Sequence, residues 1–295
     1  MGDLKVGDIV ARKSYGGDVY FKVTDIRELN GERVIILKGI SYRIEADAPE
    51  SDLIVLDDKN VTEYNSRINS IVSRKCREIQ TSNHMARYRG GSKKLYYRNT
   101  PTDNARKFSR SGKILHVDGD NDYLENCLNQ YRKFGLDVIG EFIPESEQPG
   151  KIYDLLRRHR PDILVLTGHD SVIKGDNNYS NIDNYRNSKY YIEAVREARR
   201  YEPDFDSLVI FAGACQSMYN AILKAGANYA SAPYRVLIHA LDPVFICQKV
   251  ALSGIDKVLK PSDVISNTIT GAEGIGGIET RGKYRNGFPL EPYNN

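Results

Sequence analysis

Two similar stretches decide the fold of this chain: Ile163-Leu-Val-Leu-Thr-Gly-His169-Asp170 and Leu208-Val-Ile-Phe-Ala-Gly-Ala-Cys215-Gln-Ser217. Each is an apolar run, rich in β-branched residues, that ends in small residues and then in one reactive side chain. Such runs, when helical patterns follow them, indicate buried parallel strands of an α/β sheet. Groups at the carboxyl ends of neighbouring strands converge on one crevice. We therefore predict that His169 and Cys215 form a catalytic dyad there, in which the imidazole favours the thiolate form of the cysteine.

Strand and helix patterns alternate on both sides of these stretches. Apolar runs of strand length fall at 114–117, 138–143, 163–166, 208–211 and 236–239, and helical patterns fall at 123–134, 151–160, 188–201 and 243–252. A further helix follows Cys215 and ends near Gly226. The polar segment 171–187 and the glycine-rich tail from Gly271 are predicted to be loops. The alternation predicts a mostly parallel sheet with helices on both faces.

The first 57 residues have a different, all-β pattern. Short runs of strand-forming residues at 8–12, 19–23, 33–39, 42–45 and 53–56 are separated by turn signals. So many short strands in so few residues predict a small SH3-like barrel. Barrels of this size host many unrelated functions. A docking module for a protein or nucleic acid and a barrel that only packs on the rest of the chain both fit the pattern.

Residues 58–112 are predicted to connect the barrel to the α/β domain, which spans 113–295. Apolar residues recur at helical spacing from Asp58 to about Gln80. From Ala86 to Lys113 there are nine Lys and Arg residues against a single acid, Asp103. Gly, Ser, Pro and basic residues without periodicity indicate a flexible linker. The interleaved tyrosines leave binding to single-stranded nucleic acid open as an alternative.

The composition of the whole chain excludes several classes of protein. It has 295 residues, 40% of them apolar, and a formal net charge of +3. No run is long enough to span a membrane, and the N-terminus lacks the apolar core of a signal peptide, so we expect cytoplasmic synthesis. The cysteines form no CxxC pair, which argues against a metal site and a disulfide framework. We expect no cofactor.

Position in the predicted fold separates the candidate catalytic residues from their competitors. Cys215 directly follows a strand and precedes a helix, whose N-terminal dipole favours a thiolate. Cys127 and Cys247 fall within predicted helices and are interpreted as core residues. His239 closes an apolar run and is the main competitor of His169. The other histidines are interpreted as non-catalytic. His84 lies in the approach to the linker, His116 is a satisfied core group, and His159 is at a solvated helix end.

The order and spacing of the dyad resemble those of the caspase-like peptidase clan. In both, a histidine closes one strand and a cysteine closes the next, and Ala214-Cys215-Gln216 resembles the Gln-Ala-Cys signature of caspases. Two residues depart from the clan pattern. Asp170, rather than a glycine, follows the histidine, and Gly213 replaces the glutamine of caspases, which argues against specificity for aspartate.

The chain as a whole is more similar to the YabG family of sporulation-specific peptidases. The resemblance spans nearly the full length and is most specific at Thr167-Gly-His-Asp170 and Ala212-Gly-Ala-Cys-Gln-Ser217; the opening Val6-Gly-Asp-Ile-Val is weaker evidence. It implies a cysteine endopeptidase that processes proteins of the spore coat and cortex and cleaves after basic residues, chiefly Arg. It further implies a location in the mother cell, in association with the developing spore coat.

This resemblance and the predicted topology suggest roles for further residues. The backbone N–H of Cys215, and another near Gly168 or Asp170, would stabilise the oxyanion. An arginine-specific S1 pocket requires a carboxylate. Four acids are candidates for this role, each of which is also explained as an ordinary loop or capping residue: Asp118, Asp120, Asp122 and Asp242. We also expect self-cleavage within the arginine-rich linker, at 87–110.

Three other classes of function compete with the peptidase. Class I glutamine amidotransferases also use Cys and His on an α/β sheet, but their histidine follows the cysteine, which argues against them here. A binding module that uses the barrel and the basic linker is the main alternative. A structural coat protein is the third, and it predicts that replacing Cys215 changes nothing.

Overall fold

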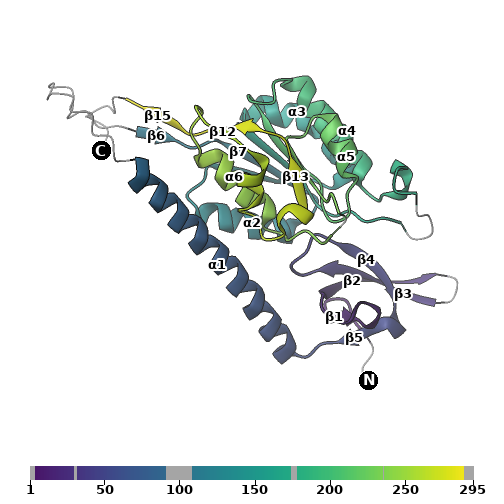
Figure 1. The fold of residues 1–295 in the computed structure, drawn as a ribbon. Helices are drawn as coiled ribbons and strands as arrows, with labels where there is room; N and C mark the ends of the chain where they lie inside the picture. Colours follow the sequence, from purple (N-terminus) through teal and green to yellow (C-terminus); the bar gives the residue numbers. More distant parts are fainter. Residues whose placement is uncertain (1–3, 30–31, 91–107, 174–177, 235, 289–295) are drawn as a thin grey trace, which may run out of the picture.

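The computed structural model describes residues 4–29, 32–90, 108–173, 178–234 and 236–288, and for residues 29, 32 and 82–90 it describes the backbone alone. Within these residues, two larger β-sheets are connected by a long helix (Figure 1). The N-terminal sheet is antiparallel. The second is mostly parallel and contains both stretches that dominate the sequence. The predicted succession of an all-β unit and an α/β unit is confirmed.

The N-terminal sheet has the strand order β4-β3-β2-β1-β5, and its neighbours are antiparallel. Its strands are β1 (Ile9–Arg12), β2 (Tyr20–Leu29), β3 (Glu32–Gly39), β4 (Glu45–Pro49) and β5 (Leu53–Val55). Alternate side chains of a strand point to the same face, and here they build an apolar core. Its most buried members include Val10, Phe21, Val23, Ile35 and Leu37.

The predicted strand at 42–45 is wrong in its position, because β4 begins only at Glu45. The connection Ile40–Ile44 between β3 and β4 reaches across to loops of the second unit instead of forming a tight hairpin. Isolated bridges join Tyr42 to His239 and Ile44 to Asp170. The strand-forming residues are therefore paired, but with partners far away in the sequence.

Helix α1 (Asp58–Gly90) follows the first sheet and extends beyond the predicted end near Gln80. Tyr64 on its inner face is buried and stacks on Tyr20 of β2, with ring centroids 4.2 Å apart. Most of the predicted basic linker, residues 91–107, lies outside the described residues. The chain is described again from β6 (Phe108–Arg110), which pairs with β15 (Arg285–Gly287).

The second sheet has the strand order β13-β11-β10-β9-β7-β8. Its members are β7 (Ile114–Asp118), β8 (Val138–Phe142), β9 (Ile163–Thr167), β10 (Val209–Ala212), β11 (Tyr229–Ser231) and β13 (Ile275–Gly277). All neighbours are parallel except β13, which is antiparallel to β11. In the registers, Asp118 lies opposite Thr167 and Leu166 opposite Ala212, so β7, β9 and β10 end at one edge.

Helices cover both faces of this sheet, as the alternation predicts (Figure 1). Val165 and Phe211 pack into a core with α2 (Asn121–Lys133) and α6 (Asp242–Leu252). Leu164 and Ile210 point the other way and pack on a second set of helices: α3 (Gln148–His159), α4 (Ser188–Tyr201) and α5 (Tyr219–Ala225). Because both faces are covered, the central strands β9 and β10 are apolar except for the terminal Thr167 of β9.

The C-terminal part differs from the prediction in two places. Val236–His239 is not a strand of the sheet; the fifth parallel strand is β11, which the sequence analysis missed. The tail predicted as loop contains the edge strand β13. Its glycines allow this pairing, because a Cβ on Gly277 would lie 2.4 Å from the Tyr229 ring. No helix in the described ranges is long and apolar enough to cross a membrane.

Candidate active site

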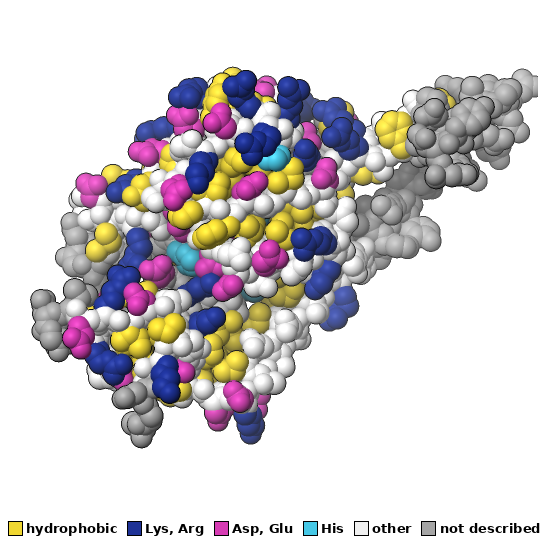
Figure 2. Space-filling view, turned by 180° about the vertical axis from the view of Figure 1, so that it is seen from behind, with side chains coloured by type: hydrophobic (Ala, Val, Ile, Leu, Met, Phe, Trp, Pro, Cys, Tyr) yellow, Lys and Arg dark blue, Asp and Glu magenta, His cyan; other side chains and the backbone are white. Residues whose placement is uncertain are grey.

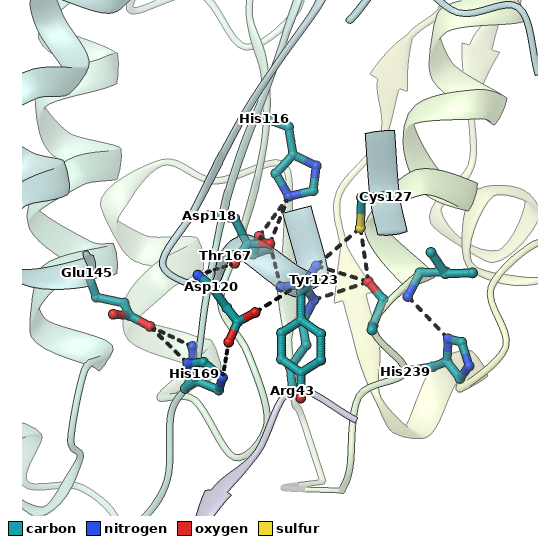
Figure 3. Close-up of polar contacts among 12 residues, drawn as sticks. Arg43, His116, Asp118, Asp120, Tyr123, Cys127, Glu145, Thr167, His169 and His239 are labelled. Carbon is teal, nitrogen blue, oxygen red and sulfur yellow. Dashed lines mark hydrogen bonds and ion pairs between the residues drawn. The ribbon is translucent and has the colours of Figure 1, made fainter. Parts of the chain in front are cut away.

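The carboxyl edge of β7, β9 and β10 collects the polar groups from which a site can be built (Figure 3). Asp118 ends β7, His169 follows β9, and Cys215 follows β10. Figure 3 also shows Arg43, from the first sheet's β3–β4 connection, among them. The edge of one unit and a segment of the other therefore meet at the site.

His169 lies between two carboxylates (Figure 3). Its Nε2 is 3.2 Å from Asp120 Oδ2 and its Nδ1 is 3.5 Å from Glu145 Oε1, while its backbone N–H donates to the same Glu145 oxygen at 2.7 Å. Burial lowers the pKa of His169, but its bonds to the two carboxylates outweigh that effect and raise the pKa to about 9. The imidazole is therefore cationic at neutral pH.

Gly168 makes this arrangement possible. Its φ is +154°, which L side chains rarely adopt, and a Cβ at this position would lie 2.2 Å from Glu145 Oε1. The chain can pass close to the carboxylate only because residue 168 has no side chain. Glu145 is thereby able to fix both the backbone and the ring of His169.

Cys215 has very different surroundings, because it is fully buried among apolar groups. Its Sγ accepts a hydrogen bond from the Ile238 N–H at 3.1 Å, and its own N–H donates to the Arg43 carbonyl at 3.3 Å. Burial raises the pKa of the thiol to about 12, so the group is neutral at pH 7. No hydrogen bond joins Cys215 to His169 in the described part of the chain.

Arg43 occupies a buried pocket beside Cys215. Its Nη1 donates to Asp118 Oδ2 at 2.7 Å, its Nη2 lies 3.3 Å from Cys127 Sγ, and Nη2 and Nε donate to the Ala240 carbonyl at 2.9 and 3.2 Å. Neither Arg43 nor Asp118 is exposed. Tyr123 closes one wall, with the guanidinium carbon 5.2 Å from its ring centroid. The pocket therefore binds a guanidinium through a carboxylate and a carbonyl.

Further polar groups hold Asp118 in place. Thr167 Oγ1 donates to Asp118 Oδ2 at 2.9 Å, and His116 Nε2 lies 3.3 Å from the same oxygen. Burial raises the pKa of Asp118, but the charge of Arg43 and the bonds from His116 and Arg43 outweigh burial, and the pKa lies well below its usual range. The carboxylate thus stays ionised at the bottom of the pocket.

The four acids predicted as S1 candidates lie in different places. Asp118 contacts Arg43, whereas Asp120 contacts His169 and ion-pairs with Lys38. Asp122 is largely exposed and pairs with Lys38 at 2.8 Å. Asp242 is buried and accepts from the Ile269 N–H at 2.6 Å, so it holds a loop rather than the pocket. The structure brings Asp118 alone of the four into contact with a guanidinium.

Asp170 is turned away from the His169 ring. Its carboxylate accepts from Ser217 Oγ at 2.9 Å and from the Asn187 N–H at 2.8 Å, and it also accepts from Ser188 Oγ. Burial raises its pKa to about 6. These bonds tie the β9 turn to the Cys215 turn, since Ser217 Oγ also accepts from the Ala214 N–H at 2.9 Å. Asp170 therefore positions the Cys215 turn.

Sequence reasoning missed two residues of the site, Arg43 and Glu145. Glu145 follows β8 at the same edge of the sheet, so its position after a strand was a usable signal. Arg43 gives no comparable signal, because a segment of the first sheet inserts into the second unit only in three dimensions. Asp120 was predicted, but with a role in substrate binding rather than beside His169.

The other cysteine and the histidines that were weighed near the site are buried: Cys247, His116 and His239. Cys247 is a buried member of the core, as predicted. His116 is buried with both ring nitrogens within 3.2 Å of hydroxyl groups, which confirms its interpretation as a satisfied core group. His239 is held by the Leu241 N–H, and burial lowers its pKa to about 4. No cluster of metal-ligating side chains is found among the described residues.

Fold and site together define an α/β enzyme with a histidine, a buried thiol and an acidic pocket at the carboxyl edge of its parallel sheet. Comparison with known proteins narrows this class. Residues 5–289 match the sequence family described as YabG peptidase U57, so the chain belongs to this family of peptidases and is a peptide-bond hydrolase. It is 39% identical over 290 residues to the sporulation-specific protease YabG of Bacillus subtilis (strain 168), covering 98% of this chain and 99% of that protein. The family predicted from the sequence is confirmed.

Proposed function

We propose that the chain is a cysteine endopeptidase that cleaves after arginine, with Cys215 as nucleophile and His169 as proton donor. The observation that carries this proposal is Arg43, whose guanidinium lies in the Asp118 pocket while its carbonyl accepts from the Cys215 N–H. A P1 arginine of a substrate would place its scissile carbonyl and its side chain in the same two positions. Asp118 is then the S1 carboxylate.

The mechanism follows from the groups around that carbonyl. The Cys215 thiol gives its proton to solvent water, and the sulfur then attacks the carbonyl carbon. The Cys215 N–H stabilises the oxyanion together with a second N–H from Gly168 or Asp170. His169, which is cationic at neutral pH, protonates the departing amine, and water then hydrolyses the thioester. Asp120 and Glu145 hold the imidazole and keep it charged.

The proposal for the biological substrates rests on the family resemblance. The Bacillus subtilis relative is a sporulation-specific protease by name. We propose by analogy that this chain acts in sporulation, in the mother cell, on proteins of the spore coat and cortex. The proposed architecture is an SH3-like barrel (1–57), a helix with a basic linker (58–112) and a caspase-like peptidase domain (113–295).

The binding-module alternative is less well supported. On the face of the molecule in Figure 2, Lys and Arg side chains are interspersed with Asp and Glu, so the described residues on that face offer no continuous basic surface for nucleic acid. The basic linker itself lies mostly outside the described residues. Membership of a peptidase family favours the enzyme over this alternative.

Self-cleavage within 87–110 is part of the proposal, because this segment offers several arginines next to the peptidase domain. On incubation, the wild-type chain should be cut after one of these arginines, and a Cys215→Ala chain should stay intact. N-terminal sequencing of the fragments would locate the cut. An equally intact wild type after prolonged incubation would contradict self-cleavage.

The decisive test of the function uses fluorogenic peptides that differ only at P1, with Arg, Lys, Asp, Asn or Ala. Wild type should cleave the Arg peptide fastest, and Cys215→Ala should cleave none. Cleavage that persists in Cys215→Ala would refute the proposed nucleophile. Equal rates for Arg and Ala would refute the proposed S1 pocket.

A further inference from the structure

The connection Ser41–Ile44 lies in the active-site crevice in the way that an extended peptide would. The Arg43 N–H donates to the Ile238 carbonyl at 2.9 Å, and the Ala240 N–H donates to the Ser41 carbonyl at 2.9 Å. Tyr42 forms an antiparallel bridge with His239 between these two bonds. Two backbone hydrogen bonds around one bridge are the pattern by which a peptide is added as a strand to an exposed edge.

The register of this pairing places one peptide bond at the thiol. The Arg43 carbonyl oxygen lies 3.3 Å from the Cys215 nitrogen, and the Arg43 side chain fills the pocket in front of Asp118. Ile44 continues along the β9 edge, where it bridges to Asp170. The segment therefore runs through the crevice on both sides of Cys215, with the Arg43–Ile44 bond at its centre.

The same segment closes the site to solvent. Cys215 is 0% exposed, and it belongs to one apolar cluster with Ile44 and the core of the first sheet. Arg43 is also 0% exposed. A peptide from solution cannot reach the sulfur or the Asp118 pocket while Ser41–Ile44 is in place.

We infer that Ser41–Ile44 is a built-in inhibitor of the peptidase, which occupies the substrate site with Arg43 in the S1 pocket and must leave before a substrate binds. This inference rests on the proposed function, since it takes the Cys215 edge as the active site. It also gives the N-terminal sheet a role that the sequence left open.

The neighbouring strands explain why this segment inhibits rather than serving as a substrate. Attack of the Cys215 sulfur on the Arg43 carbonyl would form a thioester, break the Arg43–Ile44 bond and release the Ile44 amine, with the thiol proton ending on the amine nitrogen. Lys38 and Glu45, on either side of the segment, stay paired in the β3–β4 ladder. The amine therefore remains beside the thioester, and its return re-forms the peptide bond and frees the thiol.

The test compares wild type, Arg43→Ala and the matched control Arg33→Ala. Arg33 lies in β3, the strand before this segment, and is partly exposed. Within the described residues, its side chain forms an ion pair with Glu50. Two rates are measured on the full chain: alkylation of Cys215 by iodoacetamide, followed by mass spectrometry, and cleavage of the Arg fluorogenic peptide. Arg43→Ala should raise both rates by about 10-fold or more, and Arg33→Ala should change neither.

Arg43→Lys serves as a second variant, because it keeps a cation opposite Asp118 if Arg43→Ala fails to fold. Lysine loses the paired contacts of the guanidinium, so it should raise both rates by a smaller factor. Unchanged rates in a folded Arg43 variant would overturn the inhibitor. The inhibitor would also be overturned if the wild-type chain were completely cleaved at the Arg43–Ile44 bond and the cleaved chain were fully active.

The two readouts separate this inference from the proposed function. Faster alkylation in Arg43→Ala with no cleavage of any Arg peptide would support occlusion by the segment and refute the arginine peptidase. Cleavage of the Arg peptide at equal rates by wild type and Arg43→Ala, with equal alkylation, would support the peptidase and refute the inhibitor.

Discussion

His169 and Cys215 end neighbouring strands of one sheet, but their surroundings are opposite. The imidazole lies between the carboxylates of Asp120 and Glu145, which raise its pKa to about 9. The thiol is enclosed by apolar groups, and burial raises its pKa to about 12. The histidine is thus charged and ready to donate a proton, whereas the thiol is held in its unreactive form. The sheet fixes the positions of both groups, whereas the two carboxylates set the charge of His169 and burial sets the protonation of Cys215.

The largest expected effect separates Cys215 from another buried thiol. Cys215→Ala should lower kcat/KM for an Arg peptide by at least about 10³-fold, because it removes the nucleophile. Cys247→Ala is the matched control, since Cys247 is equally buried but lies within α6. It should keep the activity and cost about 1 kcal/mol of stability. If both variants lost a comparable share of their activity, the loss would come from removing a buried side chain and not from the position of Cys215 at the carboxyl edge of the sheet.

The second comparison is between Asp118, which ends β7, and Asp122, in the first turn of the following helix α2. Asp118→Asn leaves the Arg43 guanidinium buried without its anion, and it should lower the free energy of unfolding by about 3–5 kcal/mol. Asp122→Asn, at a largely exposed position, should change it by less than about 0.5 kcal/mol. Urea unfolding measures both. The Asp118 variant should also lose the preference for Arg over Gln at P1, and retention of that preference would argue against the S1 assignment.

The charge on His169 should make stability depend on pH. Its folded-state pKa, raised to about 9 from 6.5, stabilises the fold fully below pH 6.5, and this contribution is lost as the pH rises through 9. The loss is on the order of 3 kcal/mol. His169→Gln should remove this part of the slope, while His159→Gln should leave it. Parallel stability curves for wild type and His169→Gln between pH 6 and 10 would contradict the charged imidazole.

The smallest expected effect distinguishes two glutamates of one turn. Glu145→Gln removes one of the two anions beside His169, so the pKa of His169 should fall, with a cost of about 1 kcal/mol to the charged form. Glu147→Gln, whose side chain is exposed and pairs with Lys151, should have no effect on it. NMR titration of the His169 ring measures this difference. An unchanged His169 pKa in the Glu145 variant would leave Asp120 as its only effective partner.

Local patterns predicted most of the α/β unit. The apolar runs at 163–166 and 208–211 correspond to β9 and β10, and the helical patterns at 151–160 and 188–201 correspond to α3 and α4. Buried parallel strands are recognisable because both of their faces are apolar. β11 and β13 were missed because they are short, and because the glycines of β13 are more typical of loops.

The candidate site was predictable only in part, because strand ends can be recognised in the sequence and loop conformations cannot. His169, Cys215 and Asp118 each close or follow a strand, and parallel strands bring such groups to one edge. Which of the four acids faces a guanidinium depends on loop conformation, and the short segment after β7 turns Asp120 toward His169 and leaves Asp122 in solvent. The role of Glu145 depends on close approach to Gly168.

The sequence alone determined the two kinds of sheet, their order along the chain, the edge that carries the histidine and the thiol, and the peptidase family. These features depend on local periodicity or on short sequence motifs, and both involve residues that are close together in the sequence. Only the tertiary structure decided that Arg43 fills the Asp118 pocket and that Ser41–Ile44 covers Cys215. The physical reason is that these contacts join residues of two units far apart in the sequence, which no local periodicity encodes. Burial of Cys215 then raises the pKa of its thiol.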